Sequence, residues 1–270
     1  MQTFNNQFNP IHNAHAIVEV IVFFGFPQGE LGPHIVDRFL ELKTELSEDF
    51  PSNNLFQMFE VKISEDYPSL HPKVGFELRR LKIDDSIEWL IRITPDSISI
   101  HCLDYSRWNH VYPMVEKYSE SIFEKLKGVG VSPSSIGLKY VDQFVFRGEP
   151  KDYDIANLFK RDSSVLHTRS FSSGCQWHSH SGWFEKIEGL GEVLSQINID
   201  SVIQEPQRYI ISIDHTGTYH NQIEGENLLC DSTFRALFAD RIHELNKSLL
   251  SDLLTDKMQR RINLGSEDMT

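Results

Sequence analysis

The chain has only three cysteines in 270 residues, at Cys102, Cys175 and Cys230. An odd number of widely spaced cysteines argues against a disulfide framework and fits a reducing compartment. No apolar run approaches the roughly 20 residues that a membrane helix needs. Residues 1–14 also lack the basic and apolar regions of a secretory signal. We therefore expect a cytoplasmic protein that does not enter the membrane.

Positive charge is scarce as well. The formal net charge is −13, and the deficit is shared between the halves. Residues 1–132 carry 12 Lys and Arg against 19 Asp and Glu, and residues 133–270 carry 14 against 20. Tight binding to duplex DNA depends on a basic surface that contacts phosphates. The composition therefore disfavours duplex DNA, although an acidic surface suits a basic protein partner.

Motifs that would indicate catalysis are missing. The chain contains no G-x-S-x-G nucleophile motif, no catalytic cysteine signature, no phosphate-binding G-x-x-x-x-G-K-[ST] loop and no G-x-G-x-x-G. Such motifs supply activated nucleophiles or backbone cradles for phosphate groups. Their absence favours a protein without a catalytic role and without a cofactor.

Strand and helix patterns fill the first half of the chain. β-Branched and aromatic runs predict strands at 15–26, 55–63, 73–81, 87–94 and 97–105. Apolar residues at helical spacing predict one helix over 32–48 and a longer one that begins after Tyr105. This order of elements is β-α-β4-α.

The second half suggests a repeat of that order. A strand is expected at 136–146, followed by a short helix over 152–160. A hairpin is then expected from 165–178 and 182–189, with its turn near His180–Gly182. Strands at 194–203 and 208–215 precede a final helix over about 232–262, whose apolar spacing matches that of the first long helix.

The predicted fold is therefore α+β. Two tandem β-α-β4-α units form a curved, largely antiparallel sheet with long helices packed on one face. The Gly/Ser/Pro link at 127–135 marks the boundary. The expected division is an N-terminal arm at 1–14, repeats at 15–132 and 133–263, and a tail at 264–270. This element order resembles a duplicated TATA-binding-protein-like fold, without implying DNA binding.

Three short motifs carry a resemblance to a family. They are the strand 17–24 with Glu19, the pair Tyr105-x-x-Trp108, and 137-GLKYVD-142. The chain resembles a sporadically distributed family of uncharacterised bacterial proteins of similar length. Lys139 and Asp142 stand where that family has Arg and Asn. The resemblance implies no particular activity, and it hints at a link to bacterial defence or mobile elements.

The last motif supplies candidate binding residues, namely Tyr105, Lys139, Tyr140 and Asp142. Strand alternation places Tyr140 and Asp142 on one aromatic face and Lys139 on the other. A lone carboxylate on an apolar face is costly. Asp142 is therefore expected either to bond a Lys, Arg or Tyr that joins the two halves, or to anchor a ligand in a groove between them.

Histidines offer a weaker alternative. In 175-CQWHSH-180, alternation places His178 and His180 on one strand face and Cys175 on the other, which splits the apparent metal-ligand cluster. We therefore predict no metal site. The alternative is a zinc site formed by His178 and His180, with a third ligand from His167, His215 or His220.

Trp108 opens the apolar stripe of the first long helix, and Phe234 occupies the corresponding place in the last helix. Because the stripe should face the core, we expect Trp108 to be a buried structural anchor that packs near Tyr140.

Three functions follow from these observations. The leading one is a non-enzymatic protein-interaction or regulatory module that holds a protein partner on the sheet or its edges. The second is a small-molecule-binding protein, or an unrecognised enzyme, with a site between the two halves. The third, nucleic-acid binding, is disfavoured by charge. A homo-oligomer is left open.

Overall fold

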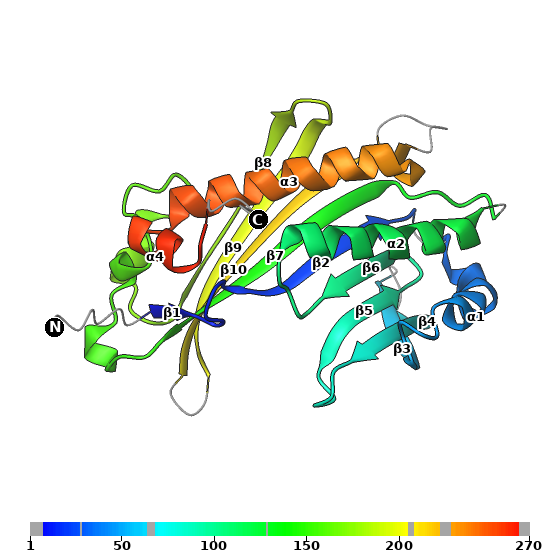
Figure 1. The fold of residues 1–270 in the computed structure, drawn as a ribbon, viewed down its shortest axis with the longest axis horizontal. Helices are drawn as coiled ribbons and strands as arrows, with labels where there is room; N and C mark the ends of the chain where they lie inside the picture. The colour runs from blue at the N-terminus through cyan, green and yellow to red at the C-terminus, as the bar shows by residue number, and fades with distance from the viewer. Residues whose placement is uncertain are drawn as a thin grey trace. The chain divides into compact units, whose positions relative to one another are not determined.

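The computed structural model describes residues 8–27, 29–63, 68–127, 129–204, 208–221 and 228–264. Its strands form one ten-stranded antiparallel sheet in the order β3-β4-β5-β6-β2-β7-β10-β9-β8, with β1 paired to β7 (Figure 1). The strands are β1 Phe8–Pro10, β2 Ile17–Gly25, β3 Ser52–Ile63, β4 Pro68–Leu81, β5 Ile87–Ile93, β6 Ser97–Cys102, β7 Ser135–Phe146, β8 Trp177–Ile187, β9 Gly191–Gln204 and β10 Arg208–His220.

The α-helices are α1 Ile35–Glu45, α2 Trp108–Leu126, α3 Ser232–Leu253 and α4 Asp256–Arg261. Short 3-10 helices lie at Gly32–His34, Pro150–Asp152, Ile155–Asn157, Thr168–Ser172 and Leu228–Cys230. Within the described part of the chain, none of the helices has the length and apolar character needed to cross a membrane.

The chain forms two compact units, each built from separated segments. Unit 1 comprises Met1–Glu19, Lys139–Gly217 and Ala239–Thr270, and unit 2 comprises Val20–Leu138 and Thr218–Phe238. Strands β2, β7 and β10 and helix α3 each contribute residues to both units.

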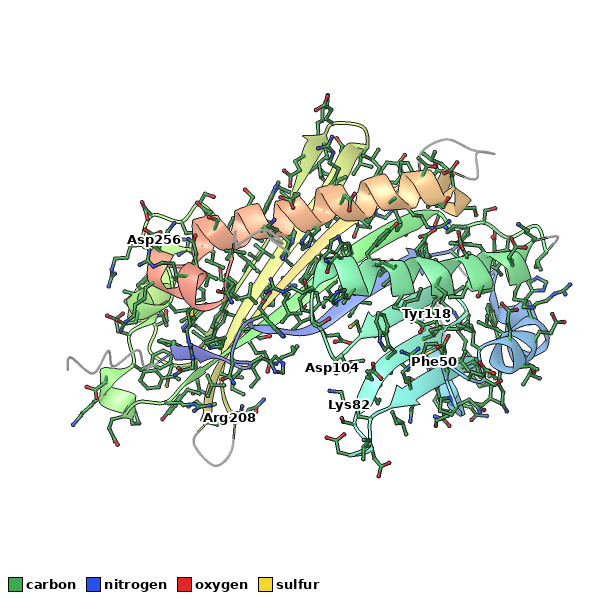
Figure 2. All side chains as sticks on the ribbon, viewed as in Figure 1. Phe50, Lys82, Asp104, Tyr118, Arg208 and Asp256 are labelled. Carbon is green, nitrogen blue, oxygen red and sulfur yellow. The ribbon has the colours of Figure 1, made fainter. Side chains whose placement is uncertain are left out.

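The core of unit 2 lies between α2 and the strands β2 to β6. Phe123 of α2 meets Phe24 of β2 edge to face, with ring centroids 4.9 Å apart. Tyr118 packs in the same way against Phe50 at 4.9 Å and against Trp89 at 5.7 Å (Figure 2). These contacts follow from the 3–4 spacing of apolar residues in α2, which gathers them on one face of the helix.

The core of unit 1 is formed by residues of the strands β7, β9 and β10, the end of α3, helix α4 and the segment between β7 and β8. That segment docks on the end of α3 through a β-bridge between Phe159 and Leu254 and a 2.9 Å hydrogen bond from the Lys160 N–H to the Leu253 carbonyl. Phe146 packs against Phe8 of β1 in a tilted arrangement, with ring centroids 5.1 Å apart. Aromatic packing thus holds the N-terminal strand in place.

The predicted fold class, with two tandem β-α-β4-α units and long helices packed on one face, is wrong. The structure is dominated by a single ten-stranded sheet. Between β7 and α3 the described part of the chain has four short 3-10 helices and three strands, where a second unit would need an α-helix and four strands. Between Pro150 and Gly174 the apolar residues span too few turns for a stable helix and instead dock on α3.

The position of one turn explains the missing strand. The hairpin was expected to turn near Gly182, but β8 continues through that residue, which pairs with Gln196 of β9. The chain reverses at Gly189 and Gly191 instead, with φ values of 84° and 88°. Glycine tolerates this left-handed region without steric cost, so these two residues set the hairpin.

Candidate functional site

Strand β7 holds three of the four residues that the sequence singled out. Tyr140 and Asp142 lie on its buried face, as alternation predicted. Lys139 lies on the opposite, half-exposed face and forms an ion pair with Asp214. Tyr105 is half-buried and belongs to unit 2, just before α2.

Helix α3 contacts the buried face of unit 1 through two polar side chains. The His243 Nδ1 lies 2.8 Å from the Tyr140 hydroxyl, and the Asn246 Oδ1 lies 3.1 Å from the His215 Nδ1. His243 and Asn246 are three residues apart, so they share one helix face. Sequence reasoning missed both, although they are polar interruptions in the apolar stripe of that helix.

Two titratable side chains in this region, Asp142 and His215, are buried, and each has polar atoms without a hydrogen-bond partner among the described residues. Asp142 is 2% exposed, and none of the described residues forms a hydrogen bond or ion pair with it. The expected bond from Asp142 to a Lys, Arg or Tyr is therefore not seen. Burial raises the pKa of Asp142 to about 7. Burial also lowers the pKa of His215 to about 4, and its Nε2 has no hydrogen-bond partner among the described residues.

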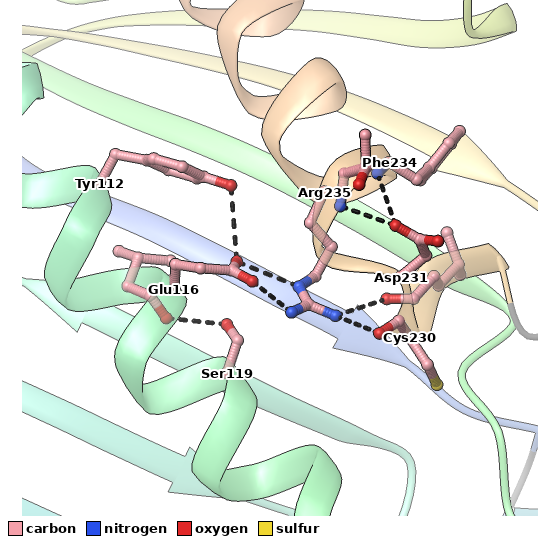
Figure 3. Close-up of polar contacts among 10 residues, drawn as sticks. Tyr112, Glu116, Ser119, Cys230, Asp231, Phe234 and Arg235 are labelled. Carbon is pink, nitrogen blue, oxygen red and sulfur yellow. Dashed lines mark hydrogen bonds and ion pairs between the residues drawn. The ribbon is translucent and has the colours of Figure 1, made fainter.

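In unit 2, Arg235 forms a clamp between the start of α3 and α2 (Figure 3). Its guanidinium binds both carboxylate oxygens of Glu116, one of them at 3.1 Å from Nε. It also donates to the carbonyls of Cys230 at 2.7 Å and Leu229 at 3.4 Å. Arg235 is only 3% exposed and lies over the Phe123 ring at 5.0 Å. Its charge is thus balanced by one carboxylate and two carbonyl dipoles.

The local sequence explains how Arg235 reaches this position. Asp231 precedes α3 and accepts hydrogen bonds from the backbone N–H groups of Thr233 at 2.7 Å and Phe234 at 3.3 Å (Figure 3). These bonds lower the pKa of Asp231 and fix the first turn of the helix. Arg235 follows in that turn and is held toward α2.

A cavity of about 770 Å³ lies beside this clamp, within unit 2. Its wall carries charges of both signs, from Lys117, Lys127, Glu120 and Arg235 among others. Burial raises the pKa of the half-buried Cys230 thiol in this wall, so the thiol stays protonated. A protonated thiol is a weak nucleophile, so the cavity offers binding space rather than thiolate chemistry.

Strand β3 forms one end of the sheet and carries exposed apolar side chains. Leu55 is 55% exposed and Phe59 is 62% exposed. Val74 on the neighbouring strand pairs with Gln57 and is 39% exposed. Alternation places all four residues on one face of the sheet. We call this set the β3 patch.

The opposite face of the same strands carries half-buried side chains and a buried carboxylate. The Phe56 ring lies over Gly75, where a Cβ atom would come within 2.3 Å of the ring. Next to it, buried Glu77 accepts hydrogen bonds from Arg79 at 3.0 Å and Arg92 at 2.7 Å. Burial alone would raise the pKa of Glu77, but these bonds outweigh it and lower the pKa.

The alternative metal ligands lie on β8. The rings of His178 and His180 are 5.2 Å apart, and the His180 Nε2 lies 3.2 Å from an Asp200 carboxylate oxygen. Across the described ranges, no group of three or more His, Cys, Asp or Glu side chains is arranged to hold a metal ion. His215, one proposed third ligand, is instead bonded to Asn246.

Comparison with known proteins does not assign a function. No protein-family model matches the chain, and a search of curated proteins found no match.

Trp108 is less buried than its place in the stripe predicted. It is the first residue of α2 and is half-buried, with its ring 5.4 Å from that of Tyr112. The fully buried part of the stripe begins one turn later, at Val111. Trp108 therefore lies at the edge of the core, before the fully buried residues of the stripe begin.

Replacing Trp108 should therefore have a moderate effect. We expect Trp108→Ala to lower the free energy of unfolding by about 1–2 kcal/mol, since only part of the indole is removed from water. Tyr118→Ala, at a fully buried position of the same helix, should cost about 3–5 kcal/mol. Urea unfolding followed by circular dichroism compares the two. Equal losses would show that Trp108 is a core residue.

Proposed function

We propose that this chain is a non-enzymatic protein-interaction module that holds a protein partner at the β3 end of its sheet. The observation that carries the proposal is the β3 patch, in which Leu55 and Phe59 are more than half exposed. Exposed apolar side chains gathered in one place are typical of surfaces that bind other proteins.

Two further features support this proposal. Strand β3 lies at the end of the strand order, and none of the other described strands pairs with its outer edge. An unpaired edge presents backbone donors and acceptors to an added strand. The net charge of −13 adds a long-range attraction for basic partners.

Capture experiments with matched variants test the proposal. We expect the wild-type chain, used as bait in a lysate of its source cells, to retain a second protein that Leu55→Lys/Phe59→Lys loses. The two lysines place charge in the patch and leave the side chains of the opposite face unchanged. Quantitative mass spectrometry of the eluates measures the ratio, which should fall at least about tenfold.

Ile83→Lys is the control. Ile83 is fully exposed in the turn between β4 and β5, so the change alters apolarity and charge without touching the patch. A partner lost equally from both variants would contradict the proposal. If native mass spectrometry instead finds a copurifying small molecule, the second function gains support. The cavity beside Arg235 has a volume typical of small-molecule sites.

A further inference from the structure

Strands β8 and β3 lie at the two ends of the sheet. Natural edge strands are protected by charge, proline, bulges or short length. Strand β8, at one end, carries a histidine pair and, close to its turn into β9, Glu185 and Lys186. Strand β3, at the other end, is twelve residues long and pairs with β4 in one unbroken register. Its residues 52–59 contain no charge and no proline, and its two charged residues, Glu60 and Lys62, lie toward its C-terminal end. Residues 52–59 therefore form an uncharged edge that none of the other described strands covers.

The pattern of apolar residues on this edge is symmetric about Gln57, so it reads the same in both directions along the strand. If a second β3 runs antiparallel with Gln57 opposite Gln57, then Leu55 lies opposite Phe59 of the other copy. The same register sets Phe56 opposite Met58 on the other face. Each apolar pair then occurs twice, and directly opposed apolar side chains stabilise neighbouring strands. Residues 55–59 carry no charge. Pairing over these residues therefore brings no like charges together, although the whole chain has a net charge of −13.

We infer that two copies of this chain associate by antiparallel pairing of their β3 strands about Gln57. The inference rests on the proposed function, since it names the partner that the β3 patch receives. A two-fold axis at Gln57 makes the interface isologous, the usual arrangement in homodimers. Pairing removes the open edge of both copies and covers Leu55 and Phe59 together.

Sedimentation of the purified chain tests the association. Across roughly 1–100 µM chain, we expect the mass to rise toward twice the 31.3 kDa of one chain. Added salt should favour the dimer, because it screens repulsion between two acidic copies. A mass that stays monomeric over the whole range would overturn the inference.

A charge exchange tests the register. In Leu55→Lys/Phe59→Lys, like charges oppose each other twice across the axis, and we expect the dissociation constant to rise at least about tenfold. In Leu55→Lys/Phe59→Glu, the new ammonium at 55 faces the new carboxylate at 59 of the other copy, so association should recover. Ile83→Lys should associate like wild type. Equal loss in both double variants, or no loss in either, would overturn pairing about Gln57.

The outcomes also separate this inference from the proposed function. A chain that stays monomeric but captures a different protein through Leu55 and Phe59 keeps the function and refutes self-pairing. A dimer that survives Leu55→Lys/Phe59→Lys refutes self-pairing through β3, and the lysate capture then decides the function independently.

Discussion

Replacing Glu116 with Gln should lower the free energy of unfolding by about 3 kcal/mol. Arg235 is almost fully buried, and Glu116 is the only carboxylate that contacts it among the described residues. A neutral amide leaves the guanidinium charge balanced only by the carbonyls of Leu229 and Cys230. Urea unfolding at pH 7 measures the loss.

A second ion pair on the same helix provides the control. Lys127 and Glu124 also pair, but both side chains are mostly exposed. Glu124→Gln should therefore change stability by less than about 0.5 kcal/mol. The double variant Glu116→Leu/Arg235→Met should recover part of the loss, because it removes the buried charge as well as its partner. If Glu116→Gln and Glu124→Gln have equal effects, the clamp does not stabilise the fold.

Local patterns predicted many elements because each depends on neighbouring residues. The strand at β2 follows from its β-branched run, and α2 follows from the spacing of Val111, Val115, Tyr118 and Ile122. Turns were harder to place. Gly182 and Gly189 look alike in the sequence, and only the backbone shows that Gly189 takes a positive φ. Misplacing that turn added a strand and created an apparent repeat.

The candidate site shows the same limit. Alternation placed Asp142 on the buried face of its strand, since the period of two is a local property. The pairing of Glu116 with Arg235 joins residues 119 positions apart, and each reads locally as an ordinary charge on a helix. The β3 patch also escaped notice. An exposed Leu and a buried Leu look identical until the neighbouring elements are placed.

The buried carboxyl of Asp142 should make stability depend on pH. Its pKa rises from 3.8 to about 7 on folding, so the folded chain retains a proton that the unfolded chain has lost. The contribution of Asp142 is therefore fully present below pH 3.8 and is lost as the pH rises through 7. The pKa of His215 falls from 6.5 to about 4 on folding. Its contribution is present above pH 6.5 and is lost as the pH falls through 4.

These two dependences oppose each other between pH 4 and 6.5. In this interval Asp142 is protonated only in the folded chain, and His215 is protonated only in the unfolded chain. In that interval the fall in stability from Asp142 cancels the rise from His215, and the wild type should be nearly flat. Between pH 6.5 and 7 only the fall from Asp142 remains. Single substitutions should therefore reveal slopes that the wild type hides.

Asp142→Asn should stabilise the protein by about 2–4 kcal/mol at pH 8, because the amide needs no charge in the buried site. At pH 4 the carboxyl is protonated in the folded wild type, so the two proteins should be nearly equal. The stability of Asp142→Asn should rise from pH 4 to 6.5, and that of His215→Gln should fall. Urea unfolding at pH 4, 5.5, 7 and 8 measures all three proteins. A difference between Asp142→Asn and wild type that stays constant with pH would show that Asp142 is charged in the folded state throughout, and hence that water or a cation reaches it.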